Sequence, residues 1–215
     1  MITDVVVVPA APLLLPEYQG RTPAVPGLLD TCVTVVARAL AAAHHVVVVH
    51  ALDRDSRSSR PAIGLRVADH LLAATHEDFD VEHVSVAWDA SVDECVTLGR
   101  ALETGSRTTL LVIGDGSARR TEKAPGHLDP RAAGVDDEIV AAIAAAAEAG
   151  LDRLLELDPQ LCADLLVAGR APFQVLAAAT GGGREGERTA YEVVDLEVSD
   201  PLGVLYVVAH LRARP

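Results

Sequence analysis

Short runs of aliphatic residues alternate with amphipathic helical patterns along this chain, and this alternation limits the possible folds more than any other feature. The segments Asp4 to Val8 and Val46 to His50 each contain four valines and have the length of buried strands. Between them, from Leu28 to Leu40, apolar residues recur every three or four positions, which is typical of one helical face. The sequence therefore predicts an α/β fold with a central, mostly buried sheet and helices on its faces.

The alternation continues through the first half of the chain. Two further strands are predicted at Val81 to Ala87 and at Thr108 to Ile113. The helix between them begins with Ser91 and Glu94, which have the spacing of a capping box. Four strands are thus expected before Gly114.

The second half predicts helices first and strands last. Three helices are expected, at Asp136 to Ala149, at Leu151 to Leu157 and after the cap Asp158-Pro159. A polar hairpin-like connection from Gly181 to Arg188 is expected next. Two strands are then expected, at Tyr191 to Val198 and at Val204 to Leu211. No repeat or linker interrupts this pattern, and 215 residues with 50% apolar content can build one sizeable core. We therefore predict one domain that spans residues 1–215.

Composition argues against several kinds of partner. The chain has 18 Lys and Arg against 31 Asp and Glu, a net charge of -13, so neither nucleic acid nor a membrane surface is expected to bind it. No apolar run approaches the ~20 residues of a membrane span, and a cytoplasmic location is expected. Cys32, Cys95 and Cys162 are widely spaced, which favours buried small apolar residues over a zinc site.

Three segments share residues, in the same order, with a known family. Val8 to Glu17 reads Val-Pro-Ala-Ala-Pro-Leu-Leu-Leu-Pro-Glu, Gly114 to Arg120 reads Gly-Asp-Gly-Ser-Ala-Arg-Arg, and Asp200 to Tyr206 reads Asp-Pro-Leu-Gly-Val-Leu-Tyr. These segments resemble motifs of the class III extradiol ring-cleaving dioxygenases and the related Memo proteins, which are Pro-His-Pro-Pro, Gly-Asp-x-Ser-His and Tyr-Glu-x-Pro-Phe-Gly-Val-Gly-Tyr. The resemblance covers the N-terminal segment and most of the second half, whereas Asp53 to Arg107 is unmatched.

The resemblance implies a metal site and also its loss. In active members of the family, two histidines and one glutamate hold Fe(II) and leave positions for a catechol and for oxygen. By motif, the first histidine position is Ala10, the acid-base histidine position is Ala118 and the glutamate position is Ser199. The resemblance therefore implies a divergent member that has lost the ancestral Fe(II), uses no other cofactor and does not cleave rings.

The pocket at the former active site is expected to retain other residues. The second histidine ligand should lie at the end of the second predicted strand, where His50 stands, and a simple hydrogen-bonding role is the alternative. His127 follows the Gly-Asp-Gly-Ser turn and either lines the pocket or is an ordinary loop residue. The complete predicted pocket consists of Ala10, His50, Asp115, Ser117, Ala118, His127 and Ser199.

The turn from Gly114 to Arg120 is the most chemically suggestive stretch of the chain. Its glycines permit unusual backbone geometry at a strand end, and Ser117 offers a hydroxyl. Arg119 and Arg120 have forked guanidinium donors that suit a carboxylate or a phosphate, so they are the candidate anion-binding residues. The alternative is that these charges pair within the loop and fix it, with acidic partners among Asp115, Glu122, Asp129 and Asp136.

Three functions remain open on the sequence. The leading hypothesis is an iron-free relative of the dioxygenases that binds a small anionic or aromatic molecule, or a protein, in a strand-end cleft. The second is a metal-dependent oxidoreductase or a hydrolase that uses relocated residues such as His50, Asp115 and His127. The third is an oligomeric scaffold protein, and a homodimer is the default assembly for such a domain.

Overall fold

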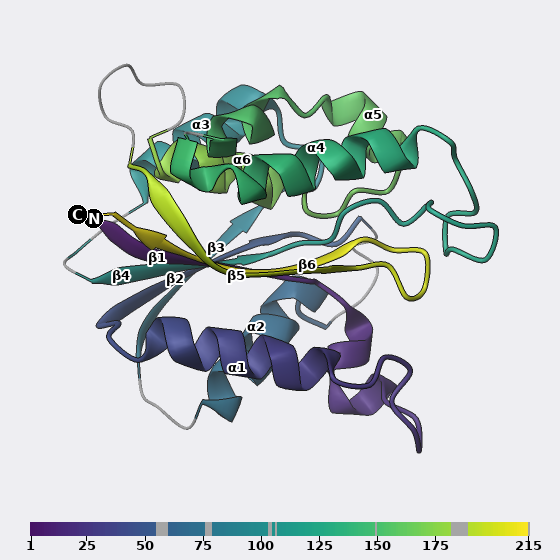
Figure 1. Ribbon diagram of the computed structural model, residues 1–215, viewed down its shortest axis with the longest axis horizontal. Helices are drawn as coiled ribbons and strands as arrows, with labels where there is room; N and C mark the ends of the chain where they lie inside the picture. Colours follow the sequence, from purple (N-terminus) through teal and green to yellow (C-terminus); the bar gives the residue numbers. More distant parts are fainter. Residues whose placement is uncertain are drawn as a thin grey trace.

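A six-stranded mixed sheet forms the centre of the molecule in the computed structural model (Figure 1). The strands lie in the order β3-β2-β4-β1-β6-β5. Strands β1 to β4 are parallel, β6 runs antiparallel to β1, and the edge strand β5 runs antiparallel to β6. The strand bounds are β1 Ile2–Val8, β2 His45–Ala51, β3 Asp80–Val86, β4 Thr108–Ile113, β5 Tyr191–Ser199 and β6 Tyr206–Ala213.

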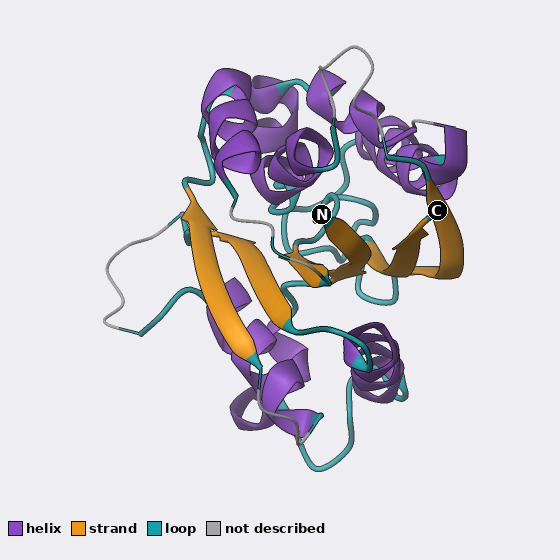
Figure 2. Ribbon diagram, turned by 90° about the vertical axis from the view of Figure 1, so that its left-hand side faces the viewer, coloured by secondary structure: helices purple, strands orange, loops and turns teal. Residues whose placement is uncertain are grey.

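Helices cover both faces of the sheet, as the two views in Figure 1 and Figure 2 show. The structure describes residues 1–54, 60–75, 79–102, 105, 107–148, 150–181 and 189–214. Its α-helices are α1 Leu28–Leu40, α2 Ile63–Ala74, α3 Val92–Ala101, α4 Ala132–Ala144, α5 Pro159–Asp164 and α6 Arg170–Ala179. Its 3-10 helices are η1 Pro12–Leu14, η2 Pro16–Tyr18, η3 Ala146–Glu148 and η4 Gly150–Glu156.

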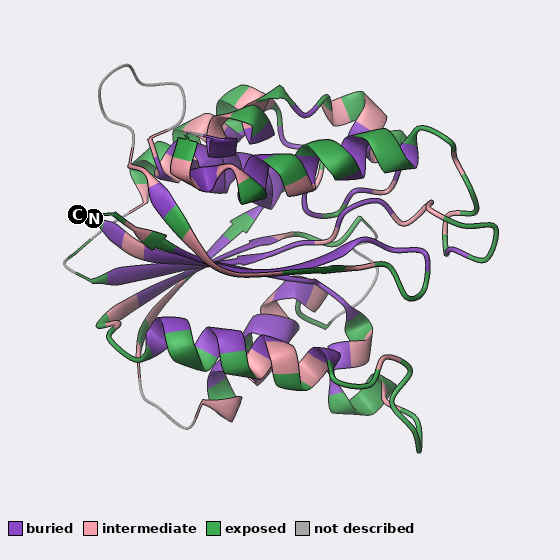
Figure 3. Cartoon of the chain, viewed as in Figure 1, coloured by how far each residue is buried: buried purple, intermediate pink, exposed green. Residues whose placement is uncertain are grey.

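The valine runs divide the core into two layers, because successive side chains of a strand point to opposite faces of the sheet. On β1, Val5 and Val7 belong to the cluster that includes Phe173 of α6. Val6 and Val8 belong to the cluster on the other face, which is built with helices α1 and α2. Figure 3 shows the sheet buried between layers whose outward helix faces are exposed. The strands are apolar on both faces because helices cover both faces of the sheet.

The parallel strands bring three chain segments to one edge of the sheet. Val8 at the end of β1 and His50 near the end of β2 are both paired with Ile113 at the end of β4. The connections after β1 and β2 place α1 and α2 on one face, whereas α3, which leads back to β4, lies on the other (Figure 1). Such a change of direction leaves room at the carboxyl ends of the strands, where open α/β sheets bind ligands.

The structure confirms the predicted fold class, and all six strands lie within two residues of their predicted bounds. The predicted capping box is present, since Ser91 and Glu94 each accept a hydrogen bond from the other's backbone N–H. The predicted cap of α5 is present too, since the Asp158 side chain accepts from the N–H of Leu161. Residues 182–188 of the predicted hairpin-like connection lie outside the described residues.

The helices of the second half differ in part from the sequence prediction. The segment predicted from Leu151 to Leu157 forms the 3-10 helix η4, and α4 ends at Ala144 rather than at Ala149. Helix α4 begins at Ala132 rather than at Asp136, because the buried face continues towards the N-terminus and Asp136 itself points inward. Helix α6 was not predicted as a separate element, because its polar side chains, Arg170 and Gln174, are only two and are buried like the rest of the run from Arg170 to Ala178, so the helix has no solvent-exposed polar face.

The three cysteines occupy interior positions. Cys32, Cys95 and Cys162 are free thiols and each is buried. Burial raises the pKa of the Cys32 and Cys162 thiols to about 12. These thiols therefore act as small apolar side chains. Among the helices that the structure describes, none is long and apolar enough to cross a membrane.

Candidate functional site

A cavity of about 150 Å³, named the edge cavity, lies at the carboxyl ends of the parallel strands. Segments that follow β1, β2 and β4 form one side of it, and the chain from α5 to the start of α6 forms the other. Most of its lining is apolar, for example Ile113 and Leu166. Its described lining also includes the charged residues Asp53, Arg54 and Arg170.

Arg170 is the buried charge of the edge cavity. It is the first residue of α6 and is only 2% exposed. Its Nη1 atom donates to the carbonyl oxygen of Ala90 and, at 3.1 Å, to Oε1 of Gln174, while Nη2 donates to the carbonyl oxygen of Trp88 at 2.8 Å. These bonds tie the start of α6 to the loop that follows β3.

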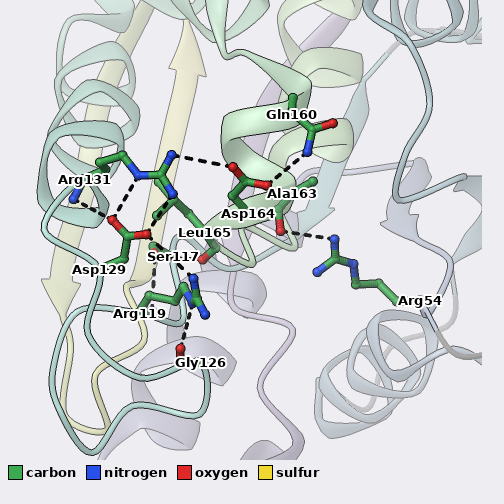
Figure 4. A network of polar contacts seen from close by, with 10 residues as sticks. All are labelled: Arg54, Ser117, Arg119, Gly126, Asp129, Arg131, Gln160, Ala163, Asp164 and Leu165. Carbon is green, nitrogen blue, oxygen red and sulfur yellow. Dashed lines mark hydrogen bonds and ion pairs between the residues drawn. The ribbon is translucent and has the colours of Figure 1, made fainter.

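Arg54 and Trp88 form the rim of the cavity. The guanidinium carbon of Arg54 lies 4.0 Å above the centroid of the Trp88 ring, which is the geometry of a cation–π contact. Nη2 of Arg54 also donates to the carbonyl oxygen of Ala163 in α5 at 3.1 Å (Figure 4). Arg54 therefore bridges the loop after β2 and the opposite side of the cavity, while its side chain remains exposed.

A second, more open depression of about 410 Å³, named the Asp115 groove, adjoins the edge cavity. Leu166 and Ala168 line both. The Oδ1 atom of Asp115 accepts a hydrogen bond of 2.8 Å from the backbone N–H of Ala10. Burial raises the pKa of Asp115 from 3.8 to about 7, although the Ala10 N–H acts in the opposite direction. A carboxyl group with a neutral pKa beside a cleft is a feature of functional sites.

Ser117 has a structural role in the turn that follows β4. Its side chain is fully buried, and Oγ donates to the carbonyl oxygen of Leu165 at 2.8 Å (Figure 4). Its backbone N–H donates to Oδ1 of the buried Asp136 at 2.7 Å. The predicted pocket role of Ser117 is therefore corrected, because a hydroxyl that is enclosed and bonded in this way does not face a ligand.

The arginines of the same turn fix the loop. Nε of Arg119 donates to the carbonyl oxygen of Gly126 at 2.7 Å, and its Nη1 lies 3.7 Å from Oδ2 of Asp129. Arg120 pairs with the buried Asp136 at 2.9 Å and with Asp200 at 2.8 Å. Neither arginine lines the edge cavity or the Asp115 groove. The geometry therefore favours the alternative of pairing within the loop over the anion-binding role.

The loop and α5 are held together in the same network. Arg131 bonds both oxygens of Asp129, and its Nη1 lies 3.6 Å from Oδ2 of Asp164 at the end of α5 (Figure 4). The Arg131 guanidinium lowers the pKa of Asp129 to about 2. These bonds position the wall shared by the edge cavity and the Asp115 groove.

The structure brings together only some of the predicted pocket residues. Ala10 lines the edge cavity, whereas Asp115 and Ala118 line the groove beside it. Ser199 ends the edge strand β5, where it pairs with Tyr206, and it lines neither space. Strand β6 lies between Ser199 and β1, and the paired residue Tyr206 lines the Asp115 groove, so the pocket role of Ser199 stays a prediction.

The two candidate histidines do not meet. His50 is 3% exposed beneath Gly64, its Nδ1 lies 3.1 Å from the carbonyl oxygen of Ala51, and burial lowers its pKa. The His127 side chain is 72% exposed and lies 3.1 Å from Glu122, so its predicted pocket role is corrected to that of a surface loop residue. His50 borders the edge cavity only through its neighbours Ala51 and Gly64.

The residues at the positions that the family resemblance assigns to iron ligands and to the acid-base histidine do not fit Fe(II). The methyl groups of Ala10 and Ala118 and the hydroxyl of Ser199 offer neither an imidazole nor a carboxylate. In the part of the chain that the structure describes, no group of three or more His, Cys, Asp or Glu side chains could hold a metal ion. The relocated set of His50, Asp115 and His127 is likewise not brought together.

Sequence reasoning missed the edge cavity's most distinctive residues. The sequence assigned no role to Arg170, and Arg54 and Trp88 lie in the segment without family resemblance. A usable signal was present, since an arginine at the start of an otherwise apolar helical segment indicates a buried charge with a special role. Neither a family model nor a curated protein matches this sequence.

Proposed function

We propose that this protein is a cytoplasmic, iron-free, divergent member of the extradiol dioxygenase superfamily that binds a small anionic or aromatic molecule in the edge cavity. The observation that carries the proposal is the cavity itself, an apolar space at the carboxyl edge of the sheet with two arginines in its lining. Its volume of about 150 Å³ suits one aromatic ring. Ring cleavage is not part of the proposed function.

Position and chemistry support this proposal. Ligands of open α/β sheets bind outside the carboxyl ends of the strands, and the edge cavity is built there from the ends of three of them. The cavity combines apolar walls with a few convergent polar groups, which is the usual composition of a small-molecule site. Ala10, at a position where the family has a ligating histidine, contributes only a methyl group to this lining.

Filling the cavity tests the proposal. Benzoate, benzamide and benzyl alcohol are titrated into the protein by calorimetry, and at least one of them is expected to bind. The variant Ala163→Leu places extra methylene groups in the space, so the measured affinity should fall by about tenfold or more. Ala141→Leu, at an exposed position of α4, is the matched control and should bind as the unchanged protein does. If no probe binds, or if Ala163→Leu has no effect, the edge cavity is not the ligand site.

The loss of iron is tested separately. Protein incubated anaerobically with ferrous iron and then desalted is expected to retain far less than one iron per chain, because alanine and serine at the former ligand positions cannot hold the ion. It should also form no ring-opened product from catechols. Stoichiometric iron together with a coloured ring-opened product would instead support the relocated-ligand hypothesis.

A further inference from the structure

The strongest unexplained feature of the molecule is the charge balance of Arg170. Every hydrogen bond that it makes to the described residues ends on a neutral acceptor, namely the carbonyl oxygens of Trp88 and Ala90, Oε1 of Gln174 and the more distant Sγ of Cys95. It forms no ion pair with any carboxylate in the described part of the chain. Among the described residues, a guanidinium that is 2% exposed thus lacks a counter-ion.

Such an arrangement is costly unless an anion completes it. A buried charge is normally paired, and carbonyl dipoles compensate only part of the lost hydration. Nη1 and one N–H of Nη2 are used by the bonds described above, whereas Nε and the second N–H of Nη2 donate to none of the described residues. A guanidinium edge formed by Nε and Nη2 matches the two oxygens of a carboxylate.

The surroundings of Arg170 define the ligand further. Arg170 lines the edge cavity, and the Arg54 guanidinium lies at the rim above Trp88. Among the described residues, the acidic one in the lining is Asp53, whose Oδ1 accepts from the backbone N–H of Ile63 and which is exposed. This carboxylate and the net charge of -13 oppose a dianion such as phosphate, whereas apolar walls favour a ring.

We propose that the ligand of the edge cavity is a small aromatic monocarboxylate whose carboxylate pairs with Arg170 and whose ring lies between the apolar walls near Trp88. This inference rests on the proposed function, because it requires the edge cavity to be the ligand site. It assigns the anion contact to Arg170, in place of the arginines of the turn that follows β4. Arg54 adds positive charge at the rim and covers the entrance side of the cavity.

Probes of equal size and different charge test the inference on the unchanged protein. Benzoate is expected to bind about tenfold or more tightly than benzamide and benzyl alcohol, because only the carboxylate forms a charged pair with the guanidinium. Salt screens the exposed Arg54 guanidinium more than the buried Arg170 guanidinium. Any larger loss of affinity for benzoate than for benzamide at high salt therefore measures the contribution of Arg54. Phosphate is expected not to compete.

Variants then locate the contact. Arg170→Gln should remove the preference for benzoate over benzamide, while Arg54→Gln, at an exposed position, should reduce it less. Arg38→Gln is the control, since Arg38 lies on α1 and pairs with Asp195, away from the cavity. If Arg170→Gln does not fold, Arg54→Gln decides the question, because a benzoate preference that persists in this variant supports Arg170 as the contact and one that is lost rejects it.

The outcomes separate the inference from the proposed function. Equal binding of benzoate and benzamide, both lost in Ala163→Leu, would retain the edge cavity as the site and reject the carboxylate contact. Absence of binding by all three probes would reject both. A benzoate preference that persists unchanged in folded Arg170→Gln would also reject the assignment to Arg170.

Discussion

Replacing Asp115 by asparagine is expected to stabilise the protein at pH 8 by about 2–4 kcal/mol. Burial raises the pKa of Asp115 from 3.8 to about 7, so the folded state holds this proton more tightly than the unfolded state. The contribution of Asp115 to the free energy of unfolding should therefore be fully present below pH 4 and should be lost as the pH rises to about 7. A difference of roughly three pKa units, at ~1.4 kcal/mol each, sets the upper limit of the expected stabilisation. The stabilisation should be smaller than this limit because Asp115 lines the open groove.

Urea denaturation between pH 5 and pH 8 measures this effect. Asparagine keeps an oxygen that can accept the N–H of Ala10, so the fold around the turn should be retained. Asp137→Asn, at an exposed position of α4, is the matched control for the general loss of one negative charge. Equal pH dependence of Asp115→Asn and the unchanged protein would show that Asp115 titrates as an ordinary solvated carboxyl group.

Substitution of Gly169 by alanine is expected to destabilise the protein by about 2–4 kcal/mol. A Cβ atom at this position would overlap the ring of Phe173 and would lie 2.7 Å from the carbonyl oxygen of Asp115. The N–H of Gly169 also donates to that oxygen at 2.8 Å, so the backbone cannot move away without losing a hydrogen bond. This close approach joins the start of α6 to the turn after β4, between the edge cavity and the groove.

Gly134→Ala is expected to have the opposite effect on the stability of the protein. Gly134 lies in α4, and a Cβ atom there would meet nothing within 4 Å. Alanine should therefore stabilise the protein by about 0.5–1 kcal/mol, because it lowers the entropy of the unfolded chain and has a higher helix propensity. A urea midpoint of Gly169→Ala that is unchanged or raised would contradict the close approach at Gly169.

The fold was largely predictable from local patterns. The four-valine runs at Val5 to Val8 and Val46 to Val49 could form only strands buried on both faces, and the structure places them at the centre of the sheet. The capping pair Ser91 and Glu94 located the start of α3 because its two reciprocal hydrogen bonds are formed between near neighbours. Helix α6 escaped this reasoning because its only two polar residues, Arg170 and Gln174, are buried and the helix has no solvent-exposed polar face.

The candidate site was predictable only in part. The turn after β4 was expected at a strand end, and Asp115 does lie there beside a groove. Which charges pair could not be read from the sequence, because Arg119 and Arg120 had several acidic residues within reach. The structure pairs Arg120 with Asp136, which is buried within α4. The sequence pattern had predicted Asp136 only as the first residue of that helix.

The amino-acid sequence by itself determined the class of fold, the strands and most helices, because these depend on the spacing of apolar residues and on caps formed by neighbouring residues. It also determined that alanine and serine stand where the family motifs have iron ligands, since this follows from residue identity alone. Only the tertiary structure decided that Arg170 is buried with no carboxylate partner in the described part of the chain, that Arg54 lies over Trp88, and that Ser199 and His127 do not line the edge cavity. These facts depend on contacts between segments far apart in the chain, which no local pattern encodes.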